Sequence, residues 1–248
     1  MNNTVVIITG ASSGIGAALA TQLAGQGASL VLAARNAERL QAVADHCDAP
    51  TAVVPTDVTQ RDAVRRLVAA AIERFGQVDV LVNNAGRGIS RPPTQLTDAD
   101  VDEMIDVNVK SVLYGMQEVL PHFRERGRGH VINVSSMLGR IPFAVIRSSY
   151  VGAKHFVNAL TAVFRAEVQQ DHPDIQFSLV SPGVVYTEFG NNALHGGIDS
   201  RDLPAGQTVD DVAAVIAGVI ASRAPDVYTR QGAQARVAAY YANVGVDP

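Results

Sequence analysis

The sequence is poor in the features that mark several large classes of protein. Among 248 residues there is one cysteine, Cys47, so no disulfide can form within the chain, and a reducing compartment is indicated. The net charge of -4 provides no basic surface for nucleic acid or for an anionic membrane. No apolar run approaches the roughly 20 residues that a membrane-spanning helix needs, and the first run, Val5 to Ile8, is too short for a signal peptide and lacks its basic leader. We therefore expect a soluble, cytoplasmic protein.

The six histidines show no spacing typical of metal ligands, so no metal site is expected. What the chain does contain is a globular composition, with 47% hydrophobic and 18% charged residues. That balance is too apolar for a disordered protein, and the length allows a sizeable core.

Short apolar runs alternate with amphipathic stretches along the whole chain. The runs predict strands buried on both faces, and the stretches between them predict helices. The predicted strands are 4–9, 28–34, 51–55, 78–82, 129–135, 175–180 and, as an edge strand, 226–229. The predicted helices are 17–23, 36–46, 60–75, 97–124, 150–170, 208–223 and 233–241. We expect one α/β domain over residues 1–248, a doubly wound, Rossmann-like parallel sheet with helices on both faces. A helical tail is expected at its C-terminal end, over about residues 230–248.

A glycine-rich turn follows the first predicted strand. Gly10, Gly14 and Gly16 stand in the order G-x-x-x-G-x-G before the first predicted helix. Glycine lets the backbone approach a pyrophosphate, and a helix N-terminus offers free N–H groups. The turn is a candidate phosphate cradle, although it can also be a connection that binds nothing, and its spacing differs from the usual G-x-G-x-x-G.

The end of the second predicted strand bears on the choice of nucleotide. An acidic residue there usually binds the ribose 2′-hydroxyl of NAD, whereas an arginine accommodates the 2′-phosphate of NADP. The strand ends in Arg35, and the nearest acid, Glu38, lies in the next predicted helix and should face solvent. Arg35 thus favours NADP(H) over NAD; the alternative is an ordinary surface arginine.

Polar residues follow the third and fourth predicted strands. Asp57 either binds the adenine amino group or caps the next helix. Asn83-Asn84-Ala85-Gly86 either locks strands together or lets a cofactor pass close by. Asn108 lies inside a predicted helix, where asparagine is unfavourable unless its side chain is used.

Tyr150 and Lys154 are four residues apart in a predicted helix, with Ser136 upstream. This spacing puts the two side chains on one helix face. An ammonium beside a phenol favours the phenolate, so we expect Lys154 to lower the pKa of Tyr150. A phenol tuned in this way can exchange a proton with a carbonyl or an alcohol, and Ser136 can hold that oxygen beside it.

A long loop follows the sixth predicted strand, over about residues 187–207. A loop of this length in a compact domain is more often a binding loop than filler. Together with the stretch before Tyr150, it supplies candidate walls for a substrate pocket: Ile89, Leu138, Phe143, Val145, Tyr186 and Phe189. Arg87, Arg91 and Arg147 are candidates for reaching a charged substrate. All these motifs follow strand ends, and ligands bind at that edge of parallel sheets.

Taken together, the motifs resemble the short-chain dehydrogenase/reductase family over nearly the whole chain. They are Thr9-Gly10-x-x-x-Gly14-x-Gly16, Asp57, Asn83-Asn84-Ala85-Gly86, Asn108, Ser136, Tyr150-x-x-x-Lys154 and Pro182-Gly183 with Thr187.

The resemblance implies a nicotinamide-dependent enzyme that interconverts a small carbonyl compound and an alcohol. It implies four catalytic residues: Asn108, Ser136, Tyr150 and Lys154. The cofactor residues are Gly10, Ser12, Ser13, Gly14, Ile15, Gly16, Arg35, Asp57, Val58, Asn84, Ala85, Gly86, Tyr150, Lys154, Pro182, Gly183, Val185 and Thr187. The substrate residues are Ser136, Leu138, Phe143, Tyr150, Tyr186 and Phe189.

Two positions depart from the family pattern. NADP-preferring members often carry a basic residue before the middle glycine, where this chain has Ser13, so the preference for NADP rests on Arg35. The interval from Ser136 to Tyr150 is slightly long, which affects the shape of the substrate pocket more than the chemistry. The resemblance further implies a homodimer or homotetramer, and it leaves open an NAD-dependent alcohol dehydrogenase or a non-catalytic nucleotide sensor on the same fold.

Overall fold

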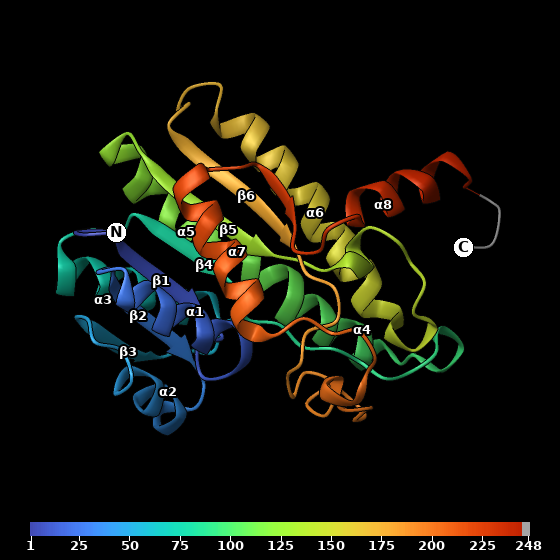
Figure 1. Cartoon of the computed structure of the whole chain (residues 1–248). Helices are drawn as coiled ribbons and strands as arrows, with labels where there is room; N and C mark the ends of the chain where they lie inside the picture. The colour runs from blue at the N-terminus through green and yellow to red at the C-terminus, as the bar shows by residue number, and fades with distance from the viewer. Residues whose placement is uncertain (245–248) are drawn as a thin grey trace.

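The structure, a computed structural model, describes residues 1–244 of the chain as a three-layered α/β fold (Figure 1). Its parallel sheet has seven strands in the order β3-β2-β1-β4-β5-β6-β7. The strands are β1 (Val5–Thr9), β2 (Ser29–Ala34), β3 (Thr51–Pro55), β4 (Val80–Asn83), β5 (Gly129–Val134), β6 (Ile175–Ser181) and β7 (Asp226–Tyr228). The α-helices are α1 (Gly14–Gly25), α2 (Ala37–Ala44), α3 (Arg61–Phe75), α4 (Asp98–Ile105), α5 (Ser111–Arg126), α6 (Ser148–Val168), α7 (Val209–Ser222) and α8 (Ala233–Ala242). These findings confirm the predicted fold class.

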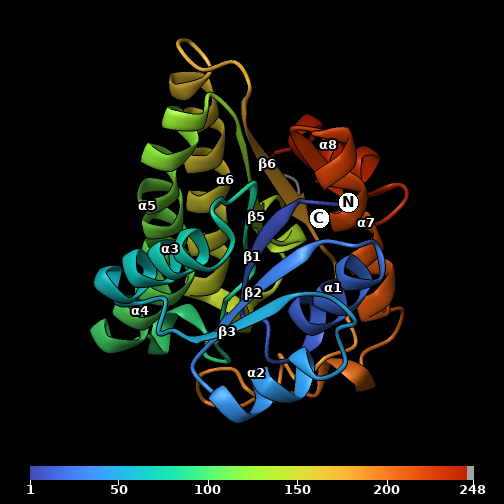
Figure 2. The same ribbon diagram turned by 90° about the vertical axis from the view of Figure 1, so that its left-hand side faces the viewer.

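The central strands are buried on both faces because helices cover both sides of the sheet (Figure 2). Helices α1, α2 and α7 pack on one face with one side of β1 and β2, and helices α3, α5 and α6 pack on the other. Apolar residues at nearly every position of a strand are what this arrangement requires.

The strand order reverses between β1 and β4, and β1 pairs in parallel register with β2 on one side and with β4 on the other. Strands β2 and β3 extend the sheet on one side of this point, and β5, β6 and β7 extend it on the other. In open α/β sheets, ligands bind beyond the carboxyl ends of the strands at such a switch point. The turns after β1, β2, β4, β5 and β6 therefore converge on one edge.

Most helix ends lie where local chemistry predicts them. Gly76 ends α3 in the left-handed region with φ of 76°, as expected of a C-terminal glycine. Thr208 and Asp211 form a capping box at the start of α7, which satisfies two orphan N–H groups.

The predicted helix over 97–124 is interrupted in its middle. A π turn, η2 (Asp106–Lys110), separates α4 from α5 and contains Asn108. Such turns insert a residue into an α-helix and often occur at functional sites. Short 3₁₀ turns also divide the loops: η1 (Pro93–Gln95), η3 (Met137–Gly139), η4 (Val145–Arg147) and η5 (Ser200–Asp202).

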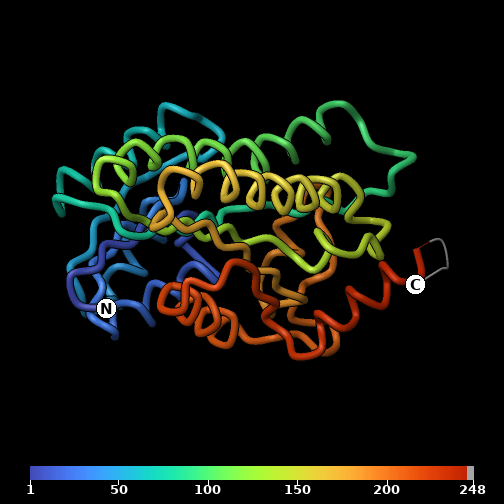
Figure 3. Tube along the Cα trace, turned by 90° about the horizontal axis from the view of Figure 1, so that it is seen from above, coloured from blue at the N-terminus to red at the C-terminus, as the bar shows by residue number. Residues whose placement is uncertain are grey.

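The C-terminal helix α8 lies beyond the sheet, at the end of the molecule away from the N-terminus (Figures 1 and 3). Its Ala233 and Val237 pack on Met137 and Ile141, which precede the Tyr150 helix. This helix agrees with the prediction for 233–241, while residues 245–248 of the expected tail lie outside the described part of the chain. Among residues 1–244, no helix is long and apolar enough to cross a membrane.

Candidate active site

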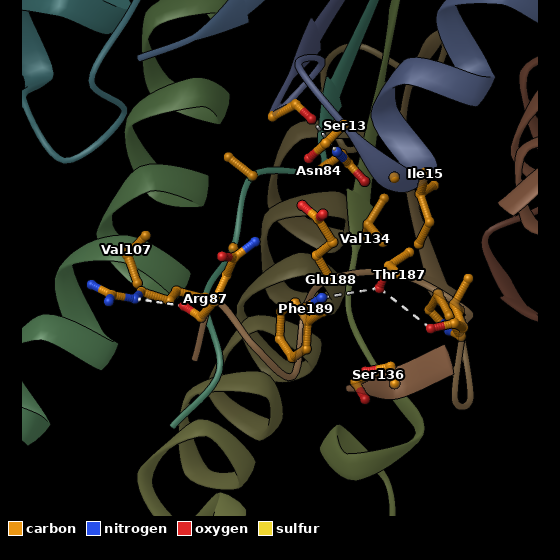
Figure 4. Close-up of a pocket in the computed structure, with 18 of the residues that line it drawn as sticks. Ser13, Ile15, Asn84, Arg87, Val107, Val134, Ser136, Thr187, Glu188 and Phe189 are labelled. Carbon is orange, nitrogen blue, oxygen red and sulfur yellow. Dashed lines mark hydrogen bonds between the residues drawn. The ribbon is translucent and has the colours of Figure 1, made fainter. Parts of the chain in front are cut away.

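A cleft of about 2100 Å³ opens at the carboxyl edge of the sheet. Nearly all of the predicted site residues line it, from the glycine turn after β1 to the loop after β6. Figure 4 shows Ser13 and Asn84 together at one end of the drawn region, and Phe189 and Ser136 toward the other. Gly16 and Asn108 are not part of the lining, so neither of these two predicted residues faces the cleft in this structure.

The turn after β1 keeps its main chain exposed to the cleft. Gly10 and Gly14 have φ of 67° and 55°, values that favour glycine. A Cβ on Gly16 would lie 2.4 Å from the carbonyl oxygen of Gly10. Gly16 therefore permits close packing of α1 against the turn, which is a role in building the cradle and not in lining it.

The two switch-point strands are joined by hydrogen bonds between the turns that follow them. The Thr9 hydroxyl accepts bonds from the backbone N–H groups of Asn84 and Ala85, at 3.0 and 3.1 Å. The Asn84 amide donates to the carbonyl oxygen of Thr9 at 2.9 Å. These contacts bear out the interpretation of 83–86 as a lock between strands, and Asn84, Ala85 and Gly86 line the cleft as well.

Arg35 lies at the end of β2 with its side chain exposed at the cleft. Glu38 follows it in the first turn of α2 and is exposed. Arg39, which sequence reasoning did not single out, also lines the cleft and forms an ion pair with Glu188 at 3.8 Å. Two guanidinium groups therefore lie at this end.

Asp57 does not cap α3, which is one of its two predicted roles. Its carboxylate accepts bonds from the backbone N–H and the hydroxyl of Thr59, at 3.0 and 2.8 Å. It thereby fixes the loop that precedes α3, while α3 itself has no side-chain cap. Both Asp57 and Val58 still line the cleft.

Asn108 is fully buried and holds the loop after β4. Its amide donates to the carbonyl oxygen of Arg87 at 2.9 Å, and its side-chain oxygen accepts from the Arg87 backbone N–H at 3.1 Å. A Cβ on Gly86 would lie 3.0 Å from that oxygen and 3.7 Å from Nζ of Lys154. Asn108 and Lys154 therefore flank Gly86 from two different helices.

Tyr150 and Lys154 are both buried in the first turns of α6. Nζ of Lys154 donates to the carbonyl oxygen of Val134 at 3.0 Å and lies 5.6 Å from the centroid of the Tyr150 ring. Ser136 begins the turn η3, and its hydroxyl accepts from the backbone N–H of Leu138 at 3.1 Å. The three predicted catalytic groups thus share one wall of the cleft.

Burial is the main influence on the pKa values of Tyr150 and Lys154. It raises the pKa of Tyr150 to about 12, and the Ser136 hydroxyl and the Arg147 charge oppose it more weakly. Burial also lowers the pKa of Lys154 to about 8. The expectation that Lys154 lowers the pKa of Tyr150 is therefore wrong for this structure, because desolvation of both groups outweighs their interaction.

The loop after β6 supplies the facing wall. The Thr187 hydroxyl donates to the carbonyl oxygen of Val185 and accepts from the Phe189 N–H, both at 3.3 Å (Figure 4). The Phe189 ring packs edge-on against Tyr150, with centroids 5.5 Å apart. The remaining residues predicted here also line the cleft: Leu138, Phe143, Pro182, Gly183 and Tyr186.

Three other predicted contributors lie elsewhere. Ile89 is wholly buried behind the cleft with Met104, and Val145 points to solvent with 67% of its surface exposed. Arg91 is ion-paired with Asp100 at 2.7 Å. The sequence patterns predict the loops that contain these residues, but not the direction in which each side chain points.

No sequence motif pointed to Asp100 as a site residue. It is buried, and it accepts from Arg91 and from His195, the latter at 2.6 Å. Hydrogen bonds from Thr97 and His195 hold the pKa of this carboxyl well below its usual range. The contact ties the loop over 187–207 to the start of α4.

Comparison with known proteins gives the same assignment. Residues 4–196 match the family described as short chain dehydrogenase. An uncharacterized oxidoreductase of Staphylococcus saprophyticus is 42% identical over 219 residues, covering 86% of this chain and 85% of that protein.

Two solved structures are similar over most of their length. A short chain dehydrogenase/reductase from Burkholderia phymatum in complex with NAD has a TM-score of 0.90 and 26% identity, covering 100% of this chain and 98% of that one. An alcohol dehydrogenase from the archaeon Thermococcus sibiricus, complexed with 5-hydroxy-NADP, has a TM-score of 0.78 and 28% identity, covering 91% and 95%. With its nucleotide-binding fold and its matched sequence, the chain belongs to the short-chain dehydrogenase/reductase family of oxidoreductases.

Proposed function

We propose that this chain interconverts a carbonyl compound and a secondary alcohol with a nicotinamide dinucleotide, NADP(H) by preference, and that Tyr150 is its general acid and base. One observation supports this best. Tyr150, Lys154 and Ser136 lie on one wall of the cleft that also contains the glycine turn after β1. A proton donor and a phosphate cradle in one cleft are the two parts that such a reaction needs.

The cleft has the features that a dinucleotide requires. Gly10 and Gly14 adopt positive φ, and a Cβ on Gly10 would come within 2.9 Å of Cα of Ala85. The main chain of this turn and the N-terminus of α1 would hold the pyrophosphate. Asp57, Val58 and Asn84 to Gly86 would line the adenosine side, and Val185 and Thr187 the nicotinamide side.

The cofactor, when bound, exchanges a hydride with the substrate carbon, and the side chains manage the proton. With a pKa raised to about 12, Tyr150 is fully protonated at neutral pH and can donate to a carbonyl oxygen. Ser136 holds that oxygen next to the phenol. Lys154, buried one turn after Tyr150, would bind the ribose of the nicotinamide, and Asn108 anchors the loop beside it.

Arg35 supports the preference for NADP. Among residues 1–244 it has no carboxylate within 4 Å, and it stands where an arginine accommodates a 2′-phosphate. Arg39, 3.8 Å from Glu188, would add a second charge.

The loop over 187–207 is proposed as the substrate loop because Phe189 contacts Tyr150. A homodimer or homotetramer is proposed from the family resemblance. The outer face of α6, where Phe156 and Val163 are exposed, is apolar enough to support it.

The test is cofactor consumption with NADPH and NADH against ketones, diketones and oxo acids. The wild type should favour NADPH, and Arg35→Ser should reduce that preference by about tenfold or more. Tyr150→Phe should lower turnover by about 10²- to 10⁴-fold while leaving cofactor binding in place. Wild-type turnover by Tyr150→Phe would refute the role of the phenol, and an NADH preference would refute the role of Arg35.

A further inference from the structure

Arg147 occupies an unusual position at the substrate end of the cleft. It is the last residue of η4, three residues before Tyr150, and it lines the cleft with a partly buried side chain. Its Nη1 donates to the carbonyl oxygen of Ile89 at 3.1 Å and to the Ser90 hydroxyl at 3.2 Å. These two bonds hold the guanidinium in a fixed orientation across the loop that follows β4.

Three of the other four arginines in the cleft have a carboxylate within 4 Å. Their pairs are Arg39 with Glu188, Arg87 with Glu103, and Arg201 with Asp199. In the described part of the chain, the two cleft arginines without a carboxylate within 4 Å are Arg35 and Arg147. Arg35 stands where a cofactor phosphate is expected, which leaves Arg147 facing the substrate end without a counter-ion.

An unpaired cation in a partly buried position is unfavourable unless a ligand supplies the opposite charge. Burial lowers the pKa of Arg147, although an arginine remains protonated in proteins. Within residues 1–244, its Nη2 and Nε have no hydrogen-bond acceptor. A guanidinium that is held in place through one nitrogen and has free N–H groups on the others can bind a carboxylate.

Glycines keep the space around this guanidinium open. A Cβ on Gly88 would lie 3.0 Å from Nη1 of Arg147, and one on Gly197 would lie 3.6 Å from Nη2. Phe189, which packs on Tyr150, also comes within 2.9 Å of the Cβ position of Gly88. The cation, the aromatic wall and the phenol therefore border one small region.

We propose that Arg147 binds an anionic group of the substrate, and that this chain accordingly acts on carbonyl compounds that carry a carboxylate; this inference rests on the proposed function. Phe189 contacts the Tyr150 ring and lies 2.9 Å from the Cβ position of Gly88, which is itself 3.0 Å from Nη1 of Arg147. The carboxylate and the reacting carbonyl should then be separated by a few bonds.

The experiment compares each acid with its own methyl ester. Values of kcat/KM are measured for 2-oxo to 5-oxo acids, for their esters and for an oxo phosphonate, with wild type, Arg147→Met, Arg147→Lys and Arg201→Met. Arg201 is the matched control because it lines the same cleft but is paired with Asp199. The pH profile of kcat is recorded for each variant, and calorimetry with NADP⁺ and 4-oxopentanoate, a pair in which neither partner can supply a hydride to the other, measures binding without turnover.

The wild type should prefer at least one acid over its ester by about tenfold to hundredfold. Arg147→Met should abolish the preference for the acid by raising KM for the acid. Arg147→Lys should restore part of the preference, and Arg201→Met should preserve it. Preference for the oxo phosphonate over every oxo acid would overturn the assignment to carboxylates.

Equal use of acids and esters by the wild type would also overturn the proposal. An equal loss of kcat/KM on acids and on esters in Arg147→Met, together with a shifted pH profile of kcat, would overturn it as well. Arg147 would then act through Tyr150. If nothing is turned over with either cofactor, the proposed function fails by itself. Weaker binding of 4-oxopentanoate to Arg147→Met than to wild type would still support the anion site, and unchanged or absent binding would refute it.

Discussion

Replacing Lys154 by methionine should make the protein without added cofactor more stable while removing its activity. Burial lowers the pKa of Lys154 from 10.5 to about 8, which means that the folded state disfavours the charged amine. Each pKa unit corresponds to about 1.4 kcal/mol, so the penalty at pH 7 is about 3 kcal/mol. Methionine fills a similar volume without a charge.

The substitution also removes the hydrogen bond to the carbonyl oxygen of Val134, at a cost of about 1 kcal/mol. The net expectation is a gain of about 2 kcal/mol in the free energy of unfolding at pH 7. Below pH 8 the lysine is protonated in both states and the wild type carries the whole penalty. Between pH 8 and 10.5 only the unfolded state keeps the proton, so wild-type stability rises and the advantage of the variant should shrink.

Urea unfolding of both proteins at pH 7, 8 and 9.5 measures these differences. The matched control is Lys110→Met, since Lys110 is the other lysine of the sequence and is exposed beside Asp106. Its effect should stay within about 0.5 kcal/mol. A Lys154→Met variant less stable than wild type, or a difference that does not change with pH, would refute the reasoning from burial.

Three further substitutions probe other parts of the site and of the core. Asn108→Ala should lower both the melting temperature and kcat, because its amide fixes the loop beside Lys154; unchanged values would contradict this. Gly16→Ala should raise KM for the cofactor, since a Cβ would lie 2.4 Å from a backbone oxygen, whereas Gly25→Ala, with nothing within 4 Å, should not. Burial lowers the pKa of His130 to about 3, so wild type should lose about 3 kcal/mol of stability between pH 7 and 4.5; His130→Gln should lose less, and equal losses in urea unfolding would exclude His130 as the cause.

The sequence predicts the scaffold well because the signals are local. Buried strands are continuous apolar runs, and their predicted limits agree with the structure within about two residues. Helix ends follow capping residues such as Thr208 and Gly76. The glycine turn and Tyr150 with Lys154 also fall into the expected cleft, because strand ends converge at one edge.

The remaining features depend on tertiary packing. The π turn around Asn108 arises where one helix must present a side chain to the loop after β4, and no residue pattern marks it. The pKa of Tyr150 depends on how deeply neighbouring elements bury it. The inward position of Ile89 and the outward position of Val145 depend on how each loop folds back, which periodicity does not describe.

One end of the cleft is formed mainly by main-chain atoms and the other mainly by side chains. The proposed nucleotide end is largely main chain, shaped by Gly10, Gly14 and Gly16 against the turn after β4. The proposed substrate end consists of side chains on the loops around 141–147 and 186–203. Substitutions in those loops can therefore alter which molecule is accepted without disturbing the backbone that holds the cofactor. The architecture thus separates an end shaped by glycines in close contact with neighbouring backbone from an end whose shape depends on side chains.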